Sequence, residues 1–223
     1  MKRINQAWRL FVESANGGIS NLKFGELTRP TFIKFLEEDL HFIDLDFETI
    51  PDHPFPENES QQVRDEIEHI IQTSKKSTLS KKELATLDKR ATNLFFDFMS
   101  ENGVHYDKEF LSHLSDDISR FAIKMKMKYQ RPRPAQLAPA LGYEFSDIPT
   151  SSDDSPSYPS GHTLIAWSLA LYLSERNPDH KDGFYDIARK IEESRIIRGA
   201  HFLSDNVFAK LLARKYVVPN IKE

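Results

Sequence analysis

The sequence predicts an all-α protein in which the helices of a single domain, residues 1–223, pack around one hydrophobic core. Apolar residues recur at steps of three and four over most of the 223-residue chain, which is the periodicity of amphipathic helices. The stretch 41–48 alternates polar and apolar residues but has no partner stretch nearby, so we interpret it as an extended loop. The longest apolar run, 163–173, is too short to cross a bilayer, which takes ~20 such residues.

Four helices are predicted in the first half of the chain, where apolar residues recur on one face. The second of them is short and turns Phe32, Phe35 and Leu36 inward. The stretch TSKKSTLSKK at 73–82 is hydrophilic and basic, and we interpret it as a solvent-exposed connection. Residues 1–80 carry no motif to which we assign a function. The four predicted helices span about 2–15, 28–36, 60–73 and 84–102.

Four more helices are predicted in the second half, which holds the motif-bearing core at about 107–216. Pro132 and Pro134 stop the first of them, because proline cannot continue a helix. The segment that follows, up to Pro159, is rich in Pro, Ser and Asp and has little periodicity. Loops of this length in compact domains tend to be functional covers or mobile. The predicted helices span about 107–129, 163–173, 182–198 and the residues from 204 onward.

Composition and charge are those of an ordinary globular protein and exclude several functions. The net charge is −4, so nothing indicates nucleic acid or an anionic membrane as a partner. Cysteine is absent, which excludes disulfides and thiolate metal sites and fits a reducing compartment. The N-terminal residues lack the uninterrupted apolar stretch of a signal peptide. We therefore expect a soluble, cytoplasmic protein, or a periplasmic one if a leader has been removed.

Three predicted helices carry polar residues where apolar ones are expected. Two inward stripes continue into Lys126 and Arg195, and a third leads back to Asp205 and His201. Taken singly, such a cation often reaches water along its apolar stem, and a His-Asp pair can lie on the surface. Together with Arg133, which follows the end of a helix, the cations would be costly to bury without a counter-charge. A bound anion of the size of phosphate would supply that charge.

The segment PSYPSGHT at 156–163 has the features of an anion site. Ser160 is suited to be a helix N-cap, and Gly161 lets the backbone approach a ligand closely. His162 adds a titratable imidazole to the first turn, beside unpaired N–H groups and the positive end of the helix dipole. Pro-Ser-Gly is also common where a loop enters a helix, so the segment alone leaves both interpretations open.

In order along the chain, these segments resemble the signature of the type 2 phosphatidic acid phosphatase superfamily, which includes the vanadium haloperoxidases. The residues that carry the resemblance are Lys126, Arg133-Pro134, Pro159-Ser160-Gly161-His162, Ser194-Arg195, His201 and Asp205. Within the superfamily, Tyr158–Thr163 and Ser204-Asp205 are most similar to the soluble class A non-specific acid phosphatases. The resemblance covers about residues 126–205 and implies an all-helical bundle of the acid phosphatase and vanadium haloperoxidase type.

The resemblance implies a histidine-based acid phosphatase that hydrolyses phosphate monoesters on small soluble substrates without a metal or cofactor. It implies that His201 is the nucleophile, that Asp205 orients it and that His162 is the general acid. The phosphate-binding residues that it implies are Lys126, Arg133, Ser160, Gly161 and Arg195. The expected partner is a small phosphorylated substrate, and phosphate or vanadate can occupy the site. Whether the protein forms a homo-oligomer stays open.

Two other functions are compatible with the same residues. A vanadate-dependent haloperoxidase uses the same anion cradle, and a non-catalytic phosphate-binding protein would retain the fold. The greater length of haloperoxidases argues against the first, and the complete set of catalytic positions argues against the second. The chain departs from the resembled family at Arg198, a cation at a position that is small or apolar in the relatives. This side chain either adds affinity for phosphate or faces water.

Overall fold

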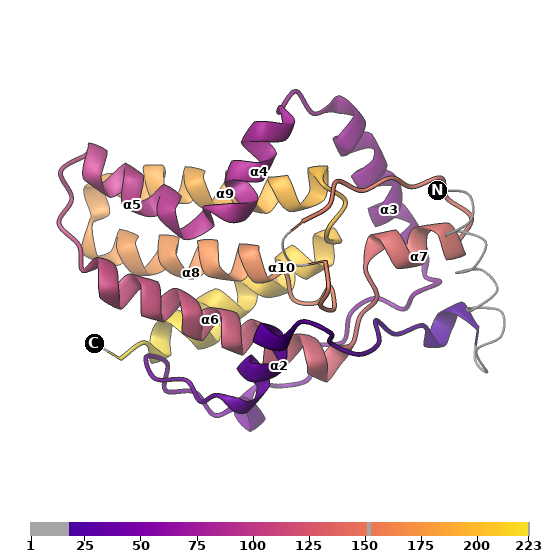
Figure 1. Ribbon diagram of the computed structural model, residues 1–223, viewed down its shortest axis with the longest axis horizontal. Coiled ribbons are helices and arrows are strands. Elements are labelled where there is room, and N and C mark those ends of the chain that lie inside the picture. Colours follow the sequence, from indigo (N-terminus) through magenta and orange to yellow (C-terminus); the bar gives the residue numbers. More distant parts are fainter. Residues whose placement is uncertain (1–17, 151–152, 223) are drawn as a thin grey trace.

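The computed structural model describes residues 18–150 and 153–222, and this part of the chain is helical, which confirms the all-α prediction (Figure 1). The helix predicted over 2–15 lies outside the described residues. Within them, extended backbone pairs at a single bridge, between Ile43 and Ile221. The main helices are α2 (Pro30–Glu37), α3 (Gln61–Lys76), α4 (Lys81–Lys89), α5 (Ala91–Glu101), α6 (Lys108–Tyr129), α7 (Pro134–Ala140), α8 (Gly161–Arg176), α9 (Lys181–Ile197) and α10 (Leu203–Leu212).

Helix α8 lies at the centre of the molecule. It packs against α5, α6, α9 and α10, and α5, α6, α8 and α9 run along the long axis of the molecule (Figure 1). Leu164, Leu169 and Ala170 of α8 are fully buried. A helix that is apolar on nearly all sides needs neighbours on all sides, so the sequence of α8 accounts for its position.

A second, smaller apolar cluster joins α3, α7 and the C-terminal end of α9. It includes Leu137, Ile196 and Phe202, whereas Ile191 of α9 and Phe208 of α10 belong to the larger cluster around α8. The polar residues that interrupt the stripes of α9 and α10 therefore lie between the two clusters. We call this boundary the seam; it is the position of the candidate site.

The stretch 84–102, predicted as one helix, forms two. Helix α4 ends at Lys89 and α5 begins at Ala91, because Arg90 has φ −122° and ψ 22° and interrupts the helix. The apolar spacing continues across the break, since spacing reports which faces are buried and not whether the backbone is continuous. The connection predicted over 73–82 is also shorter than expected. It is four residues long, from Ser77 to Ser80, where a capping box with Glu83 begins α4.

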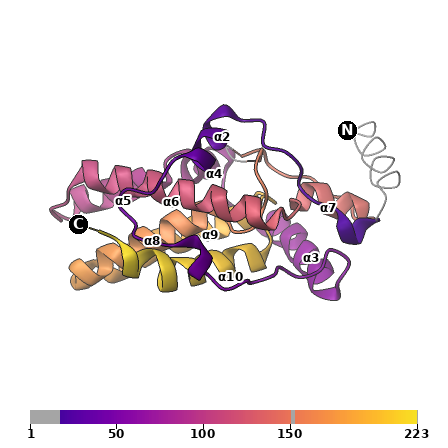
Figure 2. The ribbon, with the colours of Figure 1, turned by 90° about the horizontal axis from the view of Figure 1, so that it is seen from below.

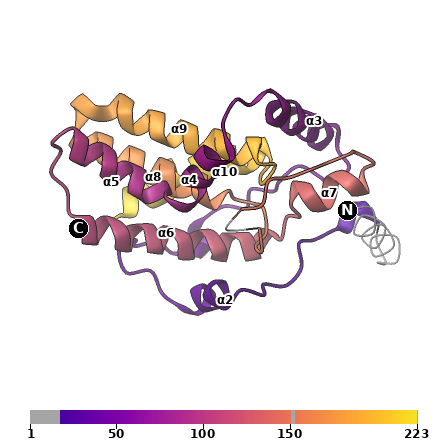
Figure 3. The same cartoon turned by 45° about the horizontal axis from the view of Figure 1, so that its top comes forward.

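Two further expectations require correction. The segment between Pro134 and Pro159 was expected to lack regular structure, but its beginning forms α7, with Pro134 at the first helical position, where a missing N–H costs nothing. The inward face of α2 is only half-buried, because α2 lies on the outside of α6 (Figures 2 and 3).

Among the described residues, no helix combines the length and hydrophobicity that crossing a bilayer requires.

Candidate active site

His201 and Asp205 lie four residues apart at the start of α10 and are in hydrogen-bond contact. The distance from His201 Nδ1 to Asp205 Oδ2 is 3.1 Å, and the two residues are 1% and 0% exposed. The backbone N–H of Phe202 and the hydroxyl of Ser157 donate to the same carboxylate oxygen, at 2.9 and 2.5 Å. Because a carboxylate accepts the Nδ1 proton, Nε2 of His201 is the unprotonated nitrogen of the neutral imidazole.

Nε2 of His201 faces Arg133, whose Nη1 lies 3.1 Å away. A guanidinium can only donate, so Nε2 accepts. Burial, and next the charge of Arg133, lower the pKa of His201 well below its usual 6.5. Burial raises the pKa of Asp205, but Arg131 and His201 lower it by more, so that it falls to about 2. At neutral pH the pair is therefore a neutral imidazole next to a carboxylate.

Lys126 and Arg133 place two buried positive charges beside this imidazole. Lys126 Nζ donates to the backbone carbonyl of Pro156, and Arg133 Nε donates to that of Ser155 at 2.7 Å. Burial lowers the pKa of Lys126 well below 10.5, with Arg133 adding to the effect. It also lowers the pKa of Arg133 to about 10. Both shifts would be relieved by a nearby anion.

The N-terminal turn of α8 carries Ser160, Gly161 and His162. Ser160 occupies the N-cap position, but its hydroxyl donates to Thr163 Oγ1 at 2.9 Å and caps no backbone N–H. A Cβ atom on Gly161 would lie 3.8 Å from Cε of Lys126, so the first turn of α8 is close to that side chain. The positive end of the α8 dipole thus adds to the charge of the site.

The imidazole of His162 contacts the C-terminal end of α4. Its Nε2 is 2.9 Å from the backbone oxygen of Asp88 and 3.6 Å from Asp88 Oδ1. A carbonyl oxygen only accepts, so Nε2 carries the proton. Burial, and next the charge of Arg195, lower the pKa of His162 to about 3. The helix break at Arg90 matters here, because it ends α4 at the point where its last carbonyl groups meet α8.

Asp88 is a site residue that the sequence analysis missed. It pairs with the fully buried Arg195, whose Nη1 is 2.7 Å from Asp88 Oδ1. Nε and Nη2 of Arg195 are buried and find no acceptor among the described residues, which is costly unless an acceptor approaches. Asp88 lies in an ordinary polar position of an amphipathic stretch, so no sequence signal distinguished it.

Arg131 is a second missed residue, and it is also fully buried. Its Nη1 is 2.5 Å from Asp205 Oδ1, and its Nη2 is 3.3 Å from Glu66 Oε2. Glu66 of α3 also accepts from the backbone N–H and hydroxyl of Ser204, at 2.8 and 2.9 Å. The guanidinium carbon of Arg131 lies 4.0 Å from the centre of the Phe202 ring. Arg131 thus supplies the counter-charge of the carboxylate that orients His201.

The predicted site residues lie at the C-terminal ends of α6 and α9, at the N-terminal ends of α8 and α10 and at the start of α7. These helix ends lie at the end of the bundle that is next to α7 (Figure 1). Burial is the largest cause of the lowered pKa of His162 and of His201, and the charge of Lys126 contributes to both shifts. Three cations and two imidazoles whose charges act on one another are suited to bind a tetrahedral oxyanion. Within the described ranges, no group of three or more His, Asp and Glu side chains is placed to hold a metal ion. The predicted residues brought together are Lys126, Arg133, Ser160, Gly161, His162, Arg195, His201 and Asp205.

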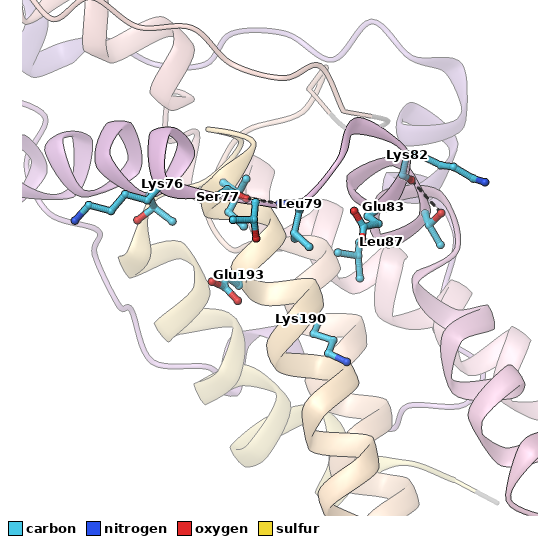
Figure 4. A pocket seen from close by; sticks show the side chains of 12 residues that line it. Lys76, Ser77, Leu79, Lys82, Glu83, Leu87, Lys190 and Glu193 are labelled. Carbon is cyan, nitrogen blue, oxygen red and sulfur yellow. Dashed lines mark hydrogen bonds between the residues drawn. The ribbon is translucent and has the colours of Figure 1, made fainter.

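A separate groove of about 910 Å³ lies between the C-terminal end of α3, α4 and α9 (Figure 4). Its described lining includes none of the predicted site residues. The groove nevertheless runs along α4 and α9, the helices that carry Asp88 and Arg195. Its charged lining residues are Lys76, Lys82, Glu83, Lys190 and Glu193.

Comparison with known proteins gives matches over the part of the chain that holds the site. A non-specific acid phosphatase of Providencia stuartii is 36% identical over 104 residues, which are 46% of this chain and 42% of that protein. An acid phosphatase of Zymomonas mobilis is 51% identical over 49 residues, which are 22% of this chain and 19% of that protein. The chain thus aligns with less than half the length of these curated relatives.

Among solved structures, a transmembrane PAP2-type phosphatidylglycerolphosphate phosphatase from Bacillus subtilis aligns with 70% of this chain and 82% of its own, with a TM-score of 0.46 and 18% identity. Residues 111–215 match the sequence profile of the PAP2 superfamily. The predicted resemblance is therefore confirmed: residues 111–215 match the PAP2 superfamily, and this part of the chain is similar to non-specific acid phosphatases.

Proposed function

We propose that the protein is a phosphatase that hydrolyses phosphate monoesters through a phosphohistidine formed on His201. The observation that carries the proposal is the pair of contacts made by the two ring nitrogens of this imidazole, from which Nε2 is inferred to be unprotonated. Nδ1 is 3.1 Å from Asp205, and Nε2 is 3.1 Å from Arg133. A nucleophilic nitrogen is thus held by an orienting carboxylate and placed beside a cation that can bind a phosphoryl oxygen. The matches to proteins named acid phosphatases agree with this proposal.

The cations account for binding of the phosphoryl group. Its oxygens would bind Lys126, Arg133 and Arg195, together with the first N–H groups of α8. The buried Nε and Nη2 of Arg195 are donors in want of an acceptor. Phosphoryl transfer requires positively charged groups next to the negatively charged equatorial oxygens and in-line approach of the nucleophile. In our proposal, the three cations meet the first requirement and His201 the second, without a metal ion. Vanadate, which adopts the same five-coordinate geometry, should therefore inhibit.

The reaction has two steps. In the first, the lone pair of His201 Nε2 attacks phosphorus, the bond from phosphorus to the ester oxygen breaks, and protonated His162 gives its proton to the departing oxygen. An alcohol leaves. In the second, water attacks phosphorus, the phosphorus–nitrogen bond breaks, and His162 takes a proton from the water. Phosphate leaves, and both imidazoles return to their starting forms.

The protonation of His162 depends on the substrate. Burial and Arg195 lower the pKa of this imidazole to about 3, which opposes the acid role. A phosphoryl dianion bound next to it would favour the imidazolium and raise that pKa. We therefore expect His162 to be protonated in the complex with substrate. The rate should fall at alkaline pH, where His162 loses this proton.

The test is hydrolysis of p-nitrophenyl phosphate with and without a chelator. Turnover should be unchanged by the chelator and should fall about 10³-fold or more in His201→Ala, since the nucleophile is lost. His105→Ala is the matched control, because His105 is exposed on the connection between α5 and α6, and it should keep full activity. Full activity of His201→Ala would refute the assignment of His201 as the nucleophile. Loss of turnover with the chelator would refute the proposal that the reaction needs no metal ion.

A further inference from the structure

The loop segment 153–156 lies directly on Lys126 and Arg133. The Nε and Nη2 atoms of Arg133 donate to the backbone oxygen and to the hydroxyl of Ser155, at 2.7 and 3.2 Å. Lys126 Nζ donates to the backbone oxygen of Pro156. Oxygens of this segment therefore occupy donors that the proposed function assigns to a phosphoryl group.

Asp153 brings a carboxylate to the same place. Its side chain is half-buried, and together with Arg133 it lines a cavity of about 240 Å³. Burial lowers the pKa of Lys126, Arg133 and Arg195, and the charge of Asp153 acts in the opposite direction on all three. The carboxylate thus supplies part of the counter-charge that the sequence analysis expects from a bound anion.

Hydrogen bonds hold this carboxylate and its loop in position. The backbone N–H and the hydroxyl of Thr150 donate to Asp153, at 2.6 and 2.5 Å. Arg198, which is 4% exposed, fixes the preceding residues: its Nη2 donates to the backbone oxygen of Pro149, and its own backbone oxygen accepts from the N–H of Ile148 at 2.9 Å. The Arg198 side chain therefore does not face water, which was one of the two interpretations of its position in the sequence.

We propose that Asp153 is an autoinhibitory counter-ion, whose carboxylate neutralises the phosphoryl site in the absence of substrate and competes with a phosphoryl group for Lys126 and Arg133. This inference rests on the proposed function, because it takes these two cations as phosphoryl-binding residues. Since like charges in one site repel, the carboxylate lowers the affinity for phosphate. Its removal should therefore tighten anion binding, whereas loss of a residue that positions the cations would weaken it.

The experiment is calorimetric titration of the wild-type protein and of Asp153→Asn with inorganic phosphate. Asparagine has the same size as aspartate and keeps an acceptor for Thr150, but it carries no charge. The Kd of phosphate should be about 10-fold or more lower in the variant, as expected for loss of one repelling charge in a partly buried site. Phosphate should also inhibit hydrolysis of p-nitrophenyl phosphate at a correspondingly lower concentration.

The matched control is Asp186→Asn, which removes one negative charge from a side chain that is 58% exposed and should leave the Kd of phosphate unchanged. Unchanged or weaker phosphate binding in Asp153→Asn, or no binding to either protein, would overturn the proposal. If Asp153→Asn does not fold, Thr150→Val decides. It removes one hydrogen bond to the carboxylate and should lower the Kd about 3-fold, and an unchanged Kd there would also overturn the proposal.

The titration distinguishes this inference from the proposed function, because phosphate binding is measured without turnover. If p-nitrophenyl phosphate is not hydrolysed, the proposed function fails, and the phosphate affinities of the wild type and Asp153→Asn still decide on the role of Asp153.

Discussion

Replacement of Arg131 by methionine should lower the free energy of unfolding by about 3–5 kcal/mol, because breaking a buried ion pair leaves a charge without its partner. The side chain is fully buried and lies 2.5 Å from Asp205 and 3.3 Å from Glu66. Both carboxylates would lose the same guanidinium. Since domains are stable by only about 5–15 kcal/mol, the loss would be a large share of the total.

The pKa of Asp205 reflects the same interaction in sum with others, because burial raises it and His201 and Ser157 lower it together with Arg131. The folded protein lowers it from 3.8 to about 2, and a shift of this size corresponds to about 2–3 kcal/mol at neutral pH. A carboxyl group with a lowered folded-state pKa stabilises the fold above its unfolded pKa and loses that contribution as the pH falls toward the folded value. Without Arg131, the effect of burial is no longer offset and the folded-state pKa of Asp205 rises toward its unfolded value, so acidification should reduce the stability of the variant less than that of the wild type.

The measurement is urea unfolding followed by circular dichroism at pH 7 and at pH 4. Arg189→Met is the control, because Arg189 and its partner Asp186 have side chains that are 55% and 58% exposed, and such a pair contributes about 0–1 kcal/mol. Combining Arg131→Met with Asp205→Asn should cost less than the sum of the two single changes, since one uncompensated charge is gone. A loss at pH 7 that does not exceed the loss in Arg189→Met would refute the reasoning.

Three further results are expected. Asp88→Asn should lower kcat/KM for p-nitrophenyl phosphate about 10-fold or more, because Arg195 loses the partner that orients it; unchanged kinetics would contradict this role. The free energy of unfolding should fall as the pH drops below about 6.5, because burial lowers the pKa of His162 in the folded protein and the unfolded chain therefore binds that proton at a higher pH. The slope of the unfolding free energy against pH, measured by urea unfolding, should be smaller in His162→Gln, and an equal slope would count against this reasoning. Gly199→Ala should cost about 1–3 kcal/mol, because Gly199 has φ +68° and a Cβ atom would lie 2.8 Å from the ring of Phe145. Gly103→Ala is the control for thermal unfolding, since Gly103 has φ +67° but open space around its Cβ position; equal losses in the two variants would exclude the steric contribution.

The predicted site residues could be found from the sequence because helical periodicity shows which face of a helix is buried. Lys126 and Arg195 continue apolar stripes, and both are buried in the structure, with exposures of 3% and 0%. A cation in such a position requires a counter-charge. The order of the motifs then indicated which segments meet, and the structure places them at one end of the bundle.

The supporting residues could not be found in this way. Asp88, Arg131 and Glu66 reach the site through contacts between α3, α4, α8 and α10, and no local spacing encodes such contacts. Each of them takes an ordinary polar position within its own segment. Their role follows only from which charged group they face in the folded chain.

The helices were predicted best where a strong cap marks their beginning. Ser60 and Asp107 accept hydrogen bonds from the backbone and begin α3 and α6, close to the predicted positions. The break at Arg90 was not predicted, because it interrupts the backbone without interrupting the apolar spacing. Helix α7 was not predicted either, because its seven residues are too few to show a period.

The seam between the two apolar clusters has a consequence for inactivation. Phe202 belongs to the smaller cluster and stacks on Arg131 at 4.0 Å, so the smaller cluster supports the charges that hold His201. If α3 and α7 came loose while α5, α6 and α8 stayed packed, most of the helical content would survive but the nucleophile would lose its orientation. Partial denaturation should therefore abolish turnover while the circular dichroism of the protein is still largely that of the folded state.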